Sequence, residues 1–380
     1  MTTTDFDIAI CGAGPVGLAL ALLLVKHGAP AGRIVLVDAK PLETASQDPR
    51  SIALSYGSRQ ILENIGAWPV VADAIHQIHV SRRGHFGRTI IDREEYGVPA
   101  LGYVARYGSL VSTLAALADR NAVVTLRPVL VASSIERDEE VELRCADGKA
   151  FTAQIMVQAE GGVFSEQATK SVSRDYDQTA VIAHVVCSKP VAHRAFERFT
   201  EEGPLALLPQ DDGYAMVWCA RPANAARLAA LPDTEFLVEL ERAFGSRLGR
   251  FTKVSPRAAF PLGLNAHAAV SSRTVAIGNA AQTLHPVAGQ GMNLGLRDAA
   301  VLARLLAREA TPEMLQQFIR LRQTDRKLTI TLTDALARIF ASAPDGALSQ
   351  SALGFSLALV DALKPAKRLL AEHMLFGSRQ

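Results

Sequence analysis

The sequence is poor in cysteine and in aromatic residues, and it carries almost no excess of one charge. Its 380 residues include only 4 cysteines, which form no CxxC pair, so neither a disulfide framework nor a zinc knuckle is predicted and a reducing compartment is expected. Lys and Arg number 40 against 38 Asp and Glu, and aromatic residues make up 6%. The basic excess and stacking rings typical of nucleic-acid-binding proteins are therefore missing, and nucleic acid is not expected as a partner.

Long apolar runs are also missing. The longest covers residues 16–25 and ends at Lys26, well short of the ~18 residues that a membrane-spanning helix needs. The N-terminal residues have no basic region ahead of an apolar core, so no signal peptide is predicted. We therefore expect a soluble, cytoplasmic protein, with peripheral contact at the inner face of a membrane as the alternative.

The composition that is present belongs to a large globular protein. Hydrophobic residues make up 49% and charged residues 21%, and a length of 380 residues predicts two to three domains with a substantial core. A strand at residues 7–11, a buried helix at 15–25 and a second strand at 33–38 follow one another along the chain. This β-α-β order predicts a parallel sheet with a right-handed crossover.

The turn between that first strand and the helix is rich in glycine. Its residues are Gly12, Ala13, Gly14, Pro15, Val16 and Gly17, and Asp38 ends the second strand. In this context the first glycine permits a tight turn, the second lets the backbone approach a pyrophosphate, and the third lets the helix pack on the sheet. The start of the helix offers N–H groups to phosphate, and the acid accepts ribose hydroxyls. These residues are predicted to bind a dinucleotide, either NAD or FAD; the alternative is an ordinary glycine turn.

A second glycine-rich stretch follows a short buried strand at residues 274–278. The residues that it offers to a ligand are Gly278, Asn279, His285, Pro286, Gly289, Gln290, Gly291, Met292 and Asn293, and a helix follows them. The amide of Asn279 can both donate and accept hydrogen bonds. The helix start after Gly289 offers free N–H groups and partial positive charge. The alternative is a glycine-rich loop that only caps a helix.

This second stretch closely resembles the second FAD motif of flavin-dependent aromatic hydroxylases, the p-hydroxybenzoate hydroxylase-like fold. Among them it looks most like the ubiquinone-biosynthesis hydroxylases of the 2-polyprenyl-6-methoxyphenol hydroxylase type. Residues 48–54, 58–68 and 364–368 extend the resemblance over nearly the whole chain. It implies an α/β protein with a Rossmann-like FAD-binding domain, an inserted mixed-sheet substrate domain and C-terminal helices. It also implies that Asn279 bonds ribityl hydroxyls and that the helix start after Gly289 faces the edge of the flavin ring that gains negative charge on reduction.

We expect the two domains to alternate along the chain. Residues 1–75, 103–170 and 268–342 are assigned to the FAD-binding domain, residues 76–102 and 171–267 to the substrate domain, and residues 343–380 to a C-terminal helical segment. In the substrate domain, the strands at residues 180–183 and 206–209 are expected to line a pocket against the flavin.

The resemblance also implies a reaction. NADH or NADPH reduces bound FAD, the reduced flavin reacts with O₂, and a flavin C4a-hydroperoxide transfers OH to an activated aromatic ring. The implied substrate is a polyprenylated phenol of ubiquinone biosynthesis, and assembly with other quinone-biosynthesis proteins is a further implied partnership. Only one GxGxxG is present, so the nicotinamide is expected to dock transiently, and no metal motif is present.

Some residues depart from the family's pattern. Many relatives carry Asp where this chain has Asn279, although the methoxyphenol hydroxylase branch resembles this chain there. The middle motif, usually Ala-Asp-Gly, is here Ala159-Glu160-Gly161, and the extra methylene moves the carboxylate away from its usual place. Contact of Glu160 with flavin or reductant is therefore open. By resemblance Arg50 and Arg106 lie near the flavin; the alternative for either is a solvated surface arginine.

Two residues of the second stretch are candidates for catalysis. His285 ionises near neutral pH and lies in the implied flavin loop, so it is a candidate acid or base, with a merely backbone-bonding histidine as the alternative. Pro286 is expected to shape the loop against the flavin ring. Elsewhere, Tyr214 and Trp218 are expected in the core of the substrate domain.

The C-terminal segment and the overall function keep alternatives. The leucine-rich residues 353–374, with Lys364, Lys367 and Arg368, either lie at a membrane surface or pack on the core. The competing functions are a flavin hydroxylase of another aromatic compound, a nicotinamide-only dehydrogenase, and a non-catalytic subunit that retains FAD.

Overall fold

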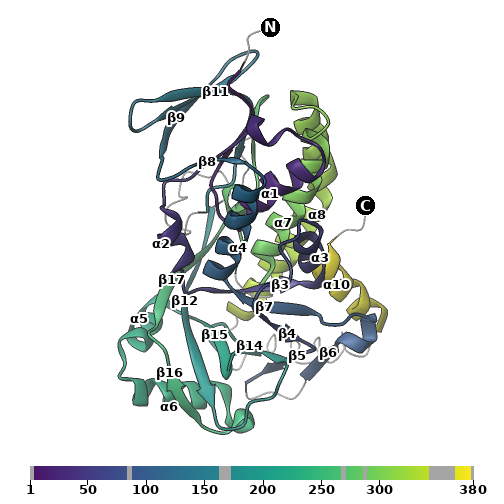
Figure 1. Cartoon of the computed structure of the whole chain (residues 1–380). Coiled ribbons are helices and arrows are strands. Elements are labelled where there is room, and N and C mark those ends of the chain that lie inside the picture. The colour runs from purple at the N-terminus through teal and green to yellow at the C-terminus, as the bar shows by residue number, and fades with distance from the viewer. Residues whose placement is uncertain are drawn as a thin grey trace.

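The strands of the protein gather into three sheets, one of which joins the other two. A computed structural model describes residues 4–83, 88–161, 173–266, 271–285, 289–341 and 364–377. Figure 1 shows a seven-stranded sheet with helices α1, α7 and α8 in the upper half of the molecule, and a nine-stranded sheet with helices α5 and α6 in the lower half. In the described residues, no helix combines the length and the apolar character needed to cross a bilayer.

The seven-stranded sheet has the strand order β8-β2-β1-β11-β10-β9, with β18 paired to β11. Its strands are β1 (Phe6–Cys11), β2 (Ile34–Val37), β8 (Val124–Leu126), β9 (Val131–Glu136), β10 (Val141–Cys145), β11 (Ala150–Gln158) and β18 (Thr274–Ala276). Strand β1 runs parallel to both β2 and β11, as the β-α-β pattern predicts. The carboxyl ends of these parallel strands meet at one edge, where open α/β sheets bind their ligands.

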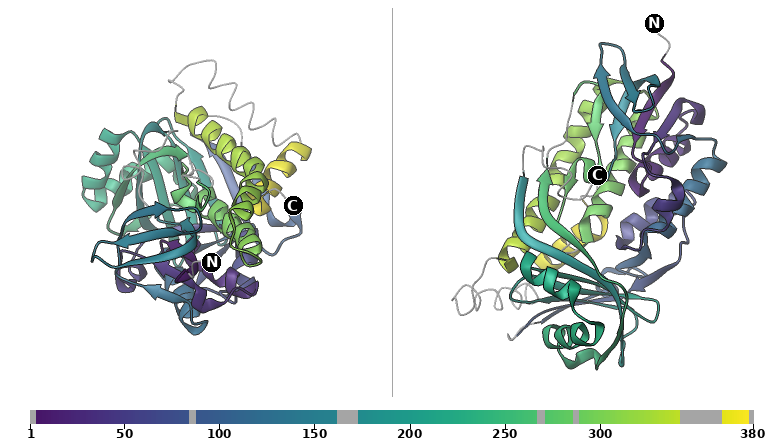
Figure 2. Two further views of the ribbon diagram at one scale, coloured as in Figure 1. Left: turned by 90° about the horizontal axis from the view of Figure 1, so that it is seen from above. Right: turned by 90° about the vertical axis from the view of Figure 1, so that its left-hand side faces the viewer.

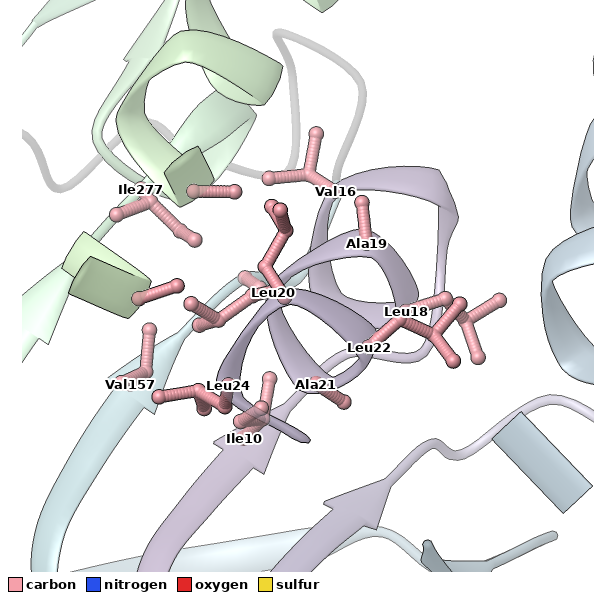
Figure 3. Packing of buried hydrophobic residues seen from close by; sticks show 14 of the residues in the cluster. Ile10, Val16, Leu18, Ala19, Leu20, Ala21, Leu22, Leu24, Val157 and Ile277 are labelled. Atoms are coloured by element: carbon pink, nitrogen blue, oxygen red, sulfur yellow. The ribbon is translucent and has the colours of Figure 1, made fainter. Parts of the chain in front are cut away.

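Helix α1 (Pro15–Lys26) lies on this sheet and is buried on every side up to Leu24. Its leucines pack against Ile10 of β1, Val157 of β11 and Ile277 after β18, and Figure 3 shows this contact from close by. Each fully buried leucine of this kind stabilises the fold by about 1.5–3 kcal/mol relative to leaving it in water. Helices α4 (Tyr107–Arg120) and α7 (Gln290–Leu306) cover the flanks of α1.

The nine-stranded sheet is mostly antiparallel. Its strands, in spatial order, are β19 (Gln282–Thr283), β17 (Ala258–Ala266), β12 (Ser173–Cys187), β15 (Gly213–Ala220), β14 (Pro204–Gln210), β13 (Arg194–Phe199), β5 (Gln77–Arg82) and β6 (Arg88–Asp92), with β16 (Phe251–Val254) paired to β12. Helices α5 (Pro222–Ala230) and α6 (Asp233–Phe244) bury one face of this sheet. The other face is turned toward the upper half of the molecule, and it positions the candidate site.

A three-stranded sheet lies between the two larger ones. It is formed by β3 (Ser51–Ser55), β7 (Gly102–Arg106) and β4 (Ala72–Ile75). Val104 of β7 and Ile75 of β4 pack against Ala195, Leu208 and Ala215 of the nine-stranded sheet. Strands β12 and β17 extend upward beside this contact (Figure 2), so the two halves are joined by packing as well as by the chain.

The remaining elements are the long helix α8 (Pro312–Ala341), several short helices and a C-terminal helix, α10 (Lys364–Phe376). The short helices are η1 (Ala31–Arg33), α2 (Leu42–Ser46), α3 (Tyr56–Asn64), η2 (Arg93–Tyr96), η4 (Ser246–Leu248) and η5 (Gly278–Ala280). The ring of Phe376 at the end of α10 packs edge-on against Tyr56 of α3. The described end of the C-terminal segment therefore packs on the protein, which is one of the two alternatives that the sequence left open.

A buried network of charges fixes α7 against α8. Asp298 of α7 accepts hydrogen bonds from Arg322 Nε at 2.7 Å and Arg326 Nη2 at 2.8 Å, and Asp325 accepts from Arg297 Nε at 3.1 Å. Both carboxylates are fully buried. Burial by itself raises the pKa of Asp298, but Arg326 and Arg322 outweigh burial and hold that pKa below its usual value. Because opposite charges are paired throughout, the network is tolerated in the interior and locks the position of α7.

The fold confirms most of the elements expected from the sequence, with shifted ends. The strand expected at residues 213–220 is Gly213–Ala220, and the Asp147-Gly148 turn joins β10 to β11 as predicted. Strand β13 was not anticipated. The domain boundaries remain a prediction, and the sheets follow them except at β19, whose residues were assigned to the FAD-binding domain but pair with β17.

Candidate functional site

The first glycine turn connects β1 to α1 and lies against the end of β11. Gly12 has φ = +107°, a conformation that side chains rarely allow, and a Cβ there would lie 2.6 Å from the backbone oxygen of Ala159. At Gly17 a Cβ would lie 1.9 Å from the carbonyl oxygen of Gly12. Glycine is therefore required at both positions, one for the turn and one for the close approach of the helix.

The N-terminus of α1 is left open to a ligand. Gly14 is the N-cap residue, Pro15 begins the helix, no described side chain caps its N–H groups, and no acid lies in its first turn. The first N–H groups of a helix have no partner within the helix, and the helix dipole adds partial positive charge there. This end of α1 can therefore hold a phosphate group.

Asp38 lies beside the same turn, at the end of β2. Its Oδ2 accepts a hydrogen bond from the backbone N–H of Ala13 at 2.7 Å, and its Oδ1 accepts one from the N–H of Lys40 at 2.8 Å. Each carboxylate oxygen has a second lone pair, so both can also accept a ribose hydroxyl. The guanidinium of Arg127 lies 3.9 Å from Oδ2 and donates to the carbonyl of Ala13.

The second glycine stretch comes to within contact of the first. Gly278 and Gly295 both pack on Val16 of α1, and a Cβ at Gly295 would lie 2.8 Å from a methyl carbon of Val16 and 3.1 Å from Cα of Gly278. Two helix starts that are far apart in the sequence therefore converge, α1 from residue 15 and α7 from residue 290. Sequence spacing indicates each motif separately, whereas the contact between them appears only in the fold.

The N-terminus of α7 resembles that of α1. Its N-cap residue Gly289 has φ = +61°, and no described side chain caps the helix. The N–H groups of Gln290, Gly291 and Met292 belong to the first turn, and a Cβ at Gly291 would lie 4.0 Å from Oδ1 of Asn279. Asn279 and the start of α7 are therefore neighbours, as a flavin cradle requires.

Asn293 has a use inside the protein. Its Oδ1 accepts hydrogen bonds from the N–H of Ser55 at 2.8 Å and from the hydroxyl of Ser58 at 2.7 Å. Its Nδ2 donates to the carbonyls of Ala53 at 3.1 Å and Gly289 at 2.8 Å. Because the amide is buried and bonded at both ends, Asn293 ties β3 to the start of α7 and acts on a ligand by positioning that helix.

These residues fit the FAD that the resemblance implies. FAD combines a pyrophosphate, a ribose, a ribityl chain and a flat ring system whose edge gains negative charge when it is reduced. One uncapped helix start with a carboxylate beside it matches the pyrophosphate and the ribose, and the other, beside Asn279, matches the ribityl chain and the ring edge. At the glycines of the two turns, a side chain would occupy space beside the backbone where the cofactor would bind.

Glu160 and Gly161 lie at the first of these turns. Glu160 follows β11, and its backbone nitrogen lies 2.6 Å from where a Cβ of Gly12 would stand. Partial burial and the nearby charge of Asp38 raise the pKa of Glu160. Its carboxylate therefore faces the nucleotide end of the candidate site rather than a distant surface. Gly162, the next residue, lies outside the described residues.

Arg50 lies over the ring of Tyr107, with its Cζ 4.8 Å from the ring centre, and pairs with Asp48. Burial of Asp48 opposes ionisation, but hydrogen bonds from Arg50 outweigh it and lower the pKa of Asp48. The hydroxyl of Tyr107 reaches Gly14, where a Cβ would lie 3.0 Å from it. Arg50 is therefore linked to the first turn through Tyr107, a residue that the sequence pattern did not indicate.

Arg106 bridges two sheets. It ends β7, is exposed, and forms an ion pair of 2.5 Å with Asp211 in the turn between β14 and β15. Ser51, its partner in β3, donates a hydrogen bond to Oε1 of Gln210 at 2.9 Å. Arg106 is exposed, as expected for a solvated surface arginine. Its ion pair with Asp211 holds the three-stranded and nine-stranded sheets together.

His285 is buried at the end of the described part of the second stretch. Its Nε2 lies 2.8 Å from Oε1 of Gln178 on β12, and its ring packs edge-on against Tyr176. Burial lowers the pKa of His285 to about 4, so the imidazole is neutral. Because the amide oxygen of Gln178 can only accept a hydrogen bond, Nε2 of His285 carries the hydrogen and donates it in that bond. This geometry favours a positioning role for His285. Pro286, the other candidate for catalysis, lies outside the described residues, as does His267.

The sheet residues expected to be structural are structural. Tyr214 and Trp218 are buried under α5 and α6, so they belong to the core as expected. Ala206 and Leu208 on β14 point to the opposite face and are half-buried, and their place in a substrate pocket stays a prediction. His184 bonds the carbonyl of Gln210 at 3.1 Å and also has a structural place. Gln178 and Arg127 are neighbours of the site that no sequence motif singled out.

Comparison with known proteins agrees with this geometry. Residues 5–328 match the family model described as the FAD binding domain. The chain is 32% identical to ubiquinone hydroxylase UbiL of Rhodospirillum rubrum, covering 97% of this chain and 89% of that protein. It is 32% identical to 3-demethoxyubiquinol 3-hydroxylase of Escherichia coli, covering 80% of this chain and 81% of that protein. The crystal structure of p-nitrophenol 4-monooxygenase PnpA from Pseudomonas putida shares the fold, with a TM-score of 0.78 at 15% identity over 100% of both chains.

Proposed function

The chain belongs to the FAD binding domain family, and from that premise we propose that it hydroxylates the aromatic ring of a polyprenylated phenol in ubiquinone biosynthesis. It is an FAD-dependent monooxygenase. The observation that carries the proposal is its similarity, over 97% of its length, to a ubiquinone hydroxylase. The closely spaced starts of α1 and α7 give that similarity a physical basis, because one matches the pyrophosphate of FAD and the other matches its ribityl chain and flavin ring.

The chain's own residues hold and orient the cofactor. The N–H groups at the start of α1 bind the pyrophosphate, and Arg127 adds a positive charge beside it. Asp38 accepts the ribose hydroxyls, and Asn279 bonds the ribityl chain. The start of α7 stabilises negative charge on the ring edge, and Asn293 holds that helix start in place. When bound, FAD supplies the activation of O₂, which no amino-acid side chain provides.

We propose that the reductant is NADH or NADPH and that it docks transiently. The chain contains one GxGxxG, and the proposal gives that motif to FAD. The edge of the site beside Glu160 and Asp38 carries two neighbouring carboxylates, which disfavour a second set of phosphates there. The nicotinamide ring therefore approaches from the side of the nine-stranded sheet.

We propose peripheral membrane contact as part of this function. A polyprenyl tail partitions into a bilayer, because each buried CH₂ gains about 0.8 kcal/mol. A hydroxylase of such a substrate works most readily beside the lipid. The basic residues Lys364, Lys367 and Arg368, which precede the packed end of α10, are the part of the chain best suited to that contact. Assembly with other quinone-biosynthesis proteins would serve the same purpose.

The proposal is tested by extracting quinone intermediates from cells that lack this protein. We expect ubiquinone to fall and one prenylated phenol to accumulate, because a blocked hydroxylation leaves its substrate unconsumed. The accumulated compound identifies the ring position. Normal ubiquinone levels with no accumulated precursor would contradict the substrate class. As a control, cells that produce an inactive variant unable to bind FAD show whether the effect comes from loss of activity or from loss of the protein itself.

A further inference from the structure

Glu197 lies in the middle of β13 and points to the face of the sheet that is turned toward the FAD-binding part. Alternate residues of a strand point to opposite faces. Its neighbour Phe196 belongs to the core under α5 and α6, so Glu197 points away from that core. Ala195, two residues earlier and on the same face as Glu197, packs against Val104 of β7. Glu197 therefore stands about 7 Å along the strand from the contact between the two halves.

The surroundings of Glu197 on that face are apolar. In the strand register it lies opposite Ala206 of β14 and Val80 of β5, and Ala206 lies opposite Val217 of β15. These three neighbours are half-buried, so this part of the face is partly open. A long apolar substrate matches such a surface. Packing does not explain why a carboxyl group lies in the middle of this apolar surface.

One oxygen of the Glu197 carboxyl, Oε1, is buried without a hydrogen-bond partner among the described residues. Its Oε1 has no accessible surface and receives no hydrogen bond from them, while the residue as a whole is half-buried. Burial raises the pKa of Glu197 to about 7. An unpaired buried carboxyl is costly to the fold, and such groups concentrate at functional sites.

The same face supports the loop that carries the second FAD motif. His285 of that loop rests on Gln178 of β12. Gln178 and Cys219 of β15 are neighbours, since both lie close to where a Cβ of Gly203 would stand. Burial raises the pKa of Cys219, and the nearby charge of Glu197 raises it further. Gln178, Cys219 and Glu197 thus connect the proposed flavin loop with this carboxyl across one surface.

Few charged groups face Glu197 from the elements around it. Arg82 on β5, Cys219 on β15 and His184 on β12 share its face by register, and β14 contributes none. His285 is the titratable group of the loop that packs on this face, and it is neutral above pH 5 because its pKa is about 4. Glu197 is the carboxyl group of this set, and burial raises its pKa to about 7.

We propose that Glu197 is the general base that accepts the proton of the substrate's phenol hydroxyl. The inference rests on the proposed function, since it assumes a phenol. One proton moves from the phenol oxygen to a carboxylate oxygen of Glu197, and no electrons are exchanged with the protein. The oxygen becomes more electron-donating, which activates the ring for hydroxylation, and the proton passes from Glu197 to solvent after turnover. A positioned base of this kind accelerates reaction by about 10²–10⁴-fold.

The test uses calorimetry of the complete FAD-loaded protein with 2-prenylphenol as the probe, between pH 6 and pH 8. When the phenol binds to ionised Glu197, binding at pH 6 releases close to one proton, measured by comparing buffers with different ionisation enthalpies. The affinity of the wild type then rises about tenfold from pH 6 to pH 8. In Glu197→Gln the proton release and the pH dependence are lost, and affinity at pH 8 falls about tenfold or more.

Glu201→Gln is the matched control, because Glu201 lies just after β13, is exposed, and only faces Arg83 at 4.0 Å. It should behave as the wild type. Binding of the phenol without proton release in the wild type would overturn the role of Glu197, and this measurement needs no variant to fold. If neither the wild type nor the control binds the phenol at any pH, the proposed substrate class fails as well, so the two failures are distinguishable.

Discussion

At the scale of single residues, burial decides what each polar group of the site can do. His285 and Glu197 are both titratable, and both are removed from water on the same face of one sheet. For the histidine, burial favours the neutral form and leaves a hydrogen-bonding residue that holds Gln178. For the glutamate, burial makes the carboxylate a stronger base than in water. The same physical cause therefore gives one residue a positioning role and the other a chemical one.

Substitution His285→Gln tests the positioning role through the pH dependence of stability. The folded pKa of about 4 lies below the ordinary value of 6.5, so the neutral histidine contributes stability above pH 6.5 that is lost as pH falls toward 4. We expect the wild type to lose about 1–3 kcal/mol more than the variant over that range. Urea unfolding at pH 7.5, 5.5 and 4.5 measures the difference. Equal losses in both proteins would show that His285 is not buried in the neutral form.

The part of the site that lies within one motif could be predicted from the sequence. Gly12 and Gly17 serve a turn and a helix five residues apart, and local spacing is enough to indicate them. Asn293 is different, because its amide bonds Ser55 and Ser58, more than 230 residues away. No spacing rule contains such a contact, so the sequence could not indicate that this side chain holds a helix, and cofactor binding by Asn293 stays a prediction.

At the scale of elements, the start of α7 is held against the start of α1 by small residues. Gly295 and Gly278 let the two helices approach around Val16. The buried network of Asp298 and Asp325 with arginines of α8 then fixes the direction of α7 from its other side. Any substitution that pushes the two helix starts apart should therefore lower the affinity for FAD, even if the new side chain does not contact FAD.

Substitution Gly295→Ala tests this contact. The added Cβ would lie 2.8 Å from a methyl carbon of Val16, so we expect the helix starts to separate and FAD affinity to fall at least tenfold. Removing that methyl in Val16→Ala/Gly295→Ala should restore part of the affinity, because the two residues are in contact and their effects are not additive. Fluorescence titration of the apoprotein with FAD gives each affinity.

Gly32→Ala is the control for this series, since a Cβ there meets nothing within 4 Å and no FAD contact is expected. It should bind FAD as the wild type does. Strictly additive losses in the double variant would contradict the account of a contact between Val16 and Gly295.

Sequence patterns predicted helices and strands well where burial on all sides determines the choice of residues. Helix α1 is buried up to Leu24 and strand β15 is buried except at Val217, and uninterrupted apolar runs indicate both elements. Strand β13 was missed because its sequence, Arg-Ala-Phe-Glu-Arg-Phe, places a glutamate among residues that face inward. That interruption was itself a signal, since a charged residue on the inner face of a strand is more often functional than structural.

At the scale of the whole molecule, the site exists because two halves of the chain meet. The FAD motifs lie on one half and Glu197 on the other, and Val104 of β7 packs on the sheet that carries Glu197. The ion pair of Arg106 with Asp211 and the hydrogen bond of Ser51 with Gln210 join the same two halves. These contacts hold the strand that carries Glu197 in a fixed position relative to the starts of α1 and α7.

The most direct test of the account is turnover of a prenylated phenol by the FAD-loaded protein in ¹⁸O₂ with NADH or NADPH. A monooxygenase places one atom of O₂ in the product and the other in water, so the account predicts a hydroxylated phenol that carries a single ¹⁸O, detected by mass spectrometry. Reductant consumed with only hydrogen peroxide formed, or a product whose new oxygen comes from water, would contradict it.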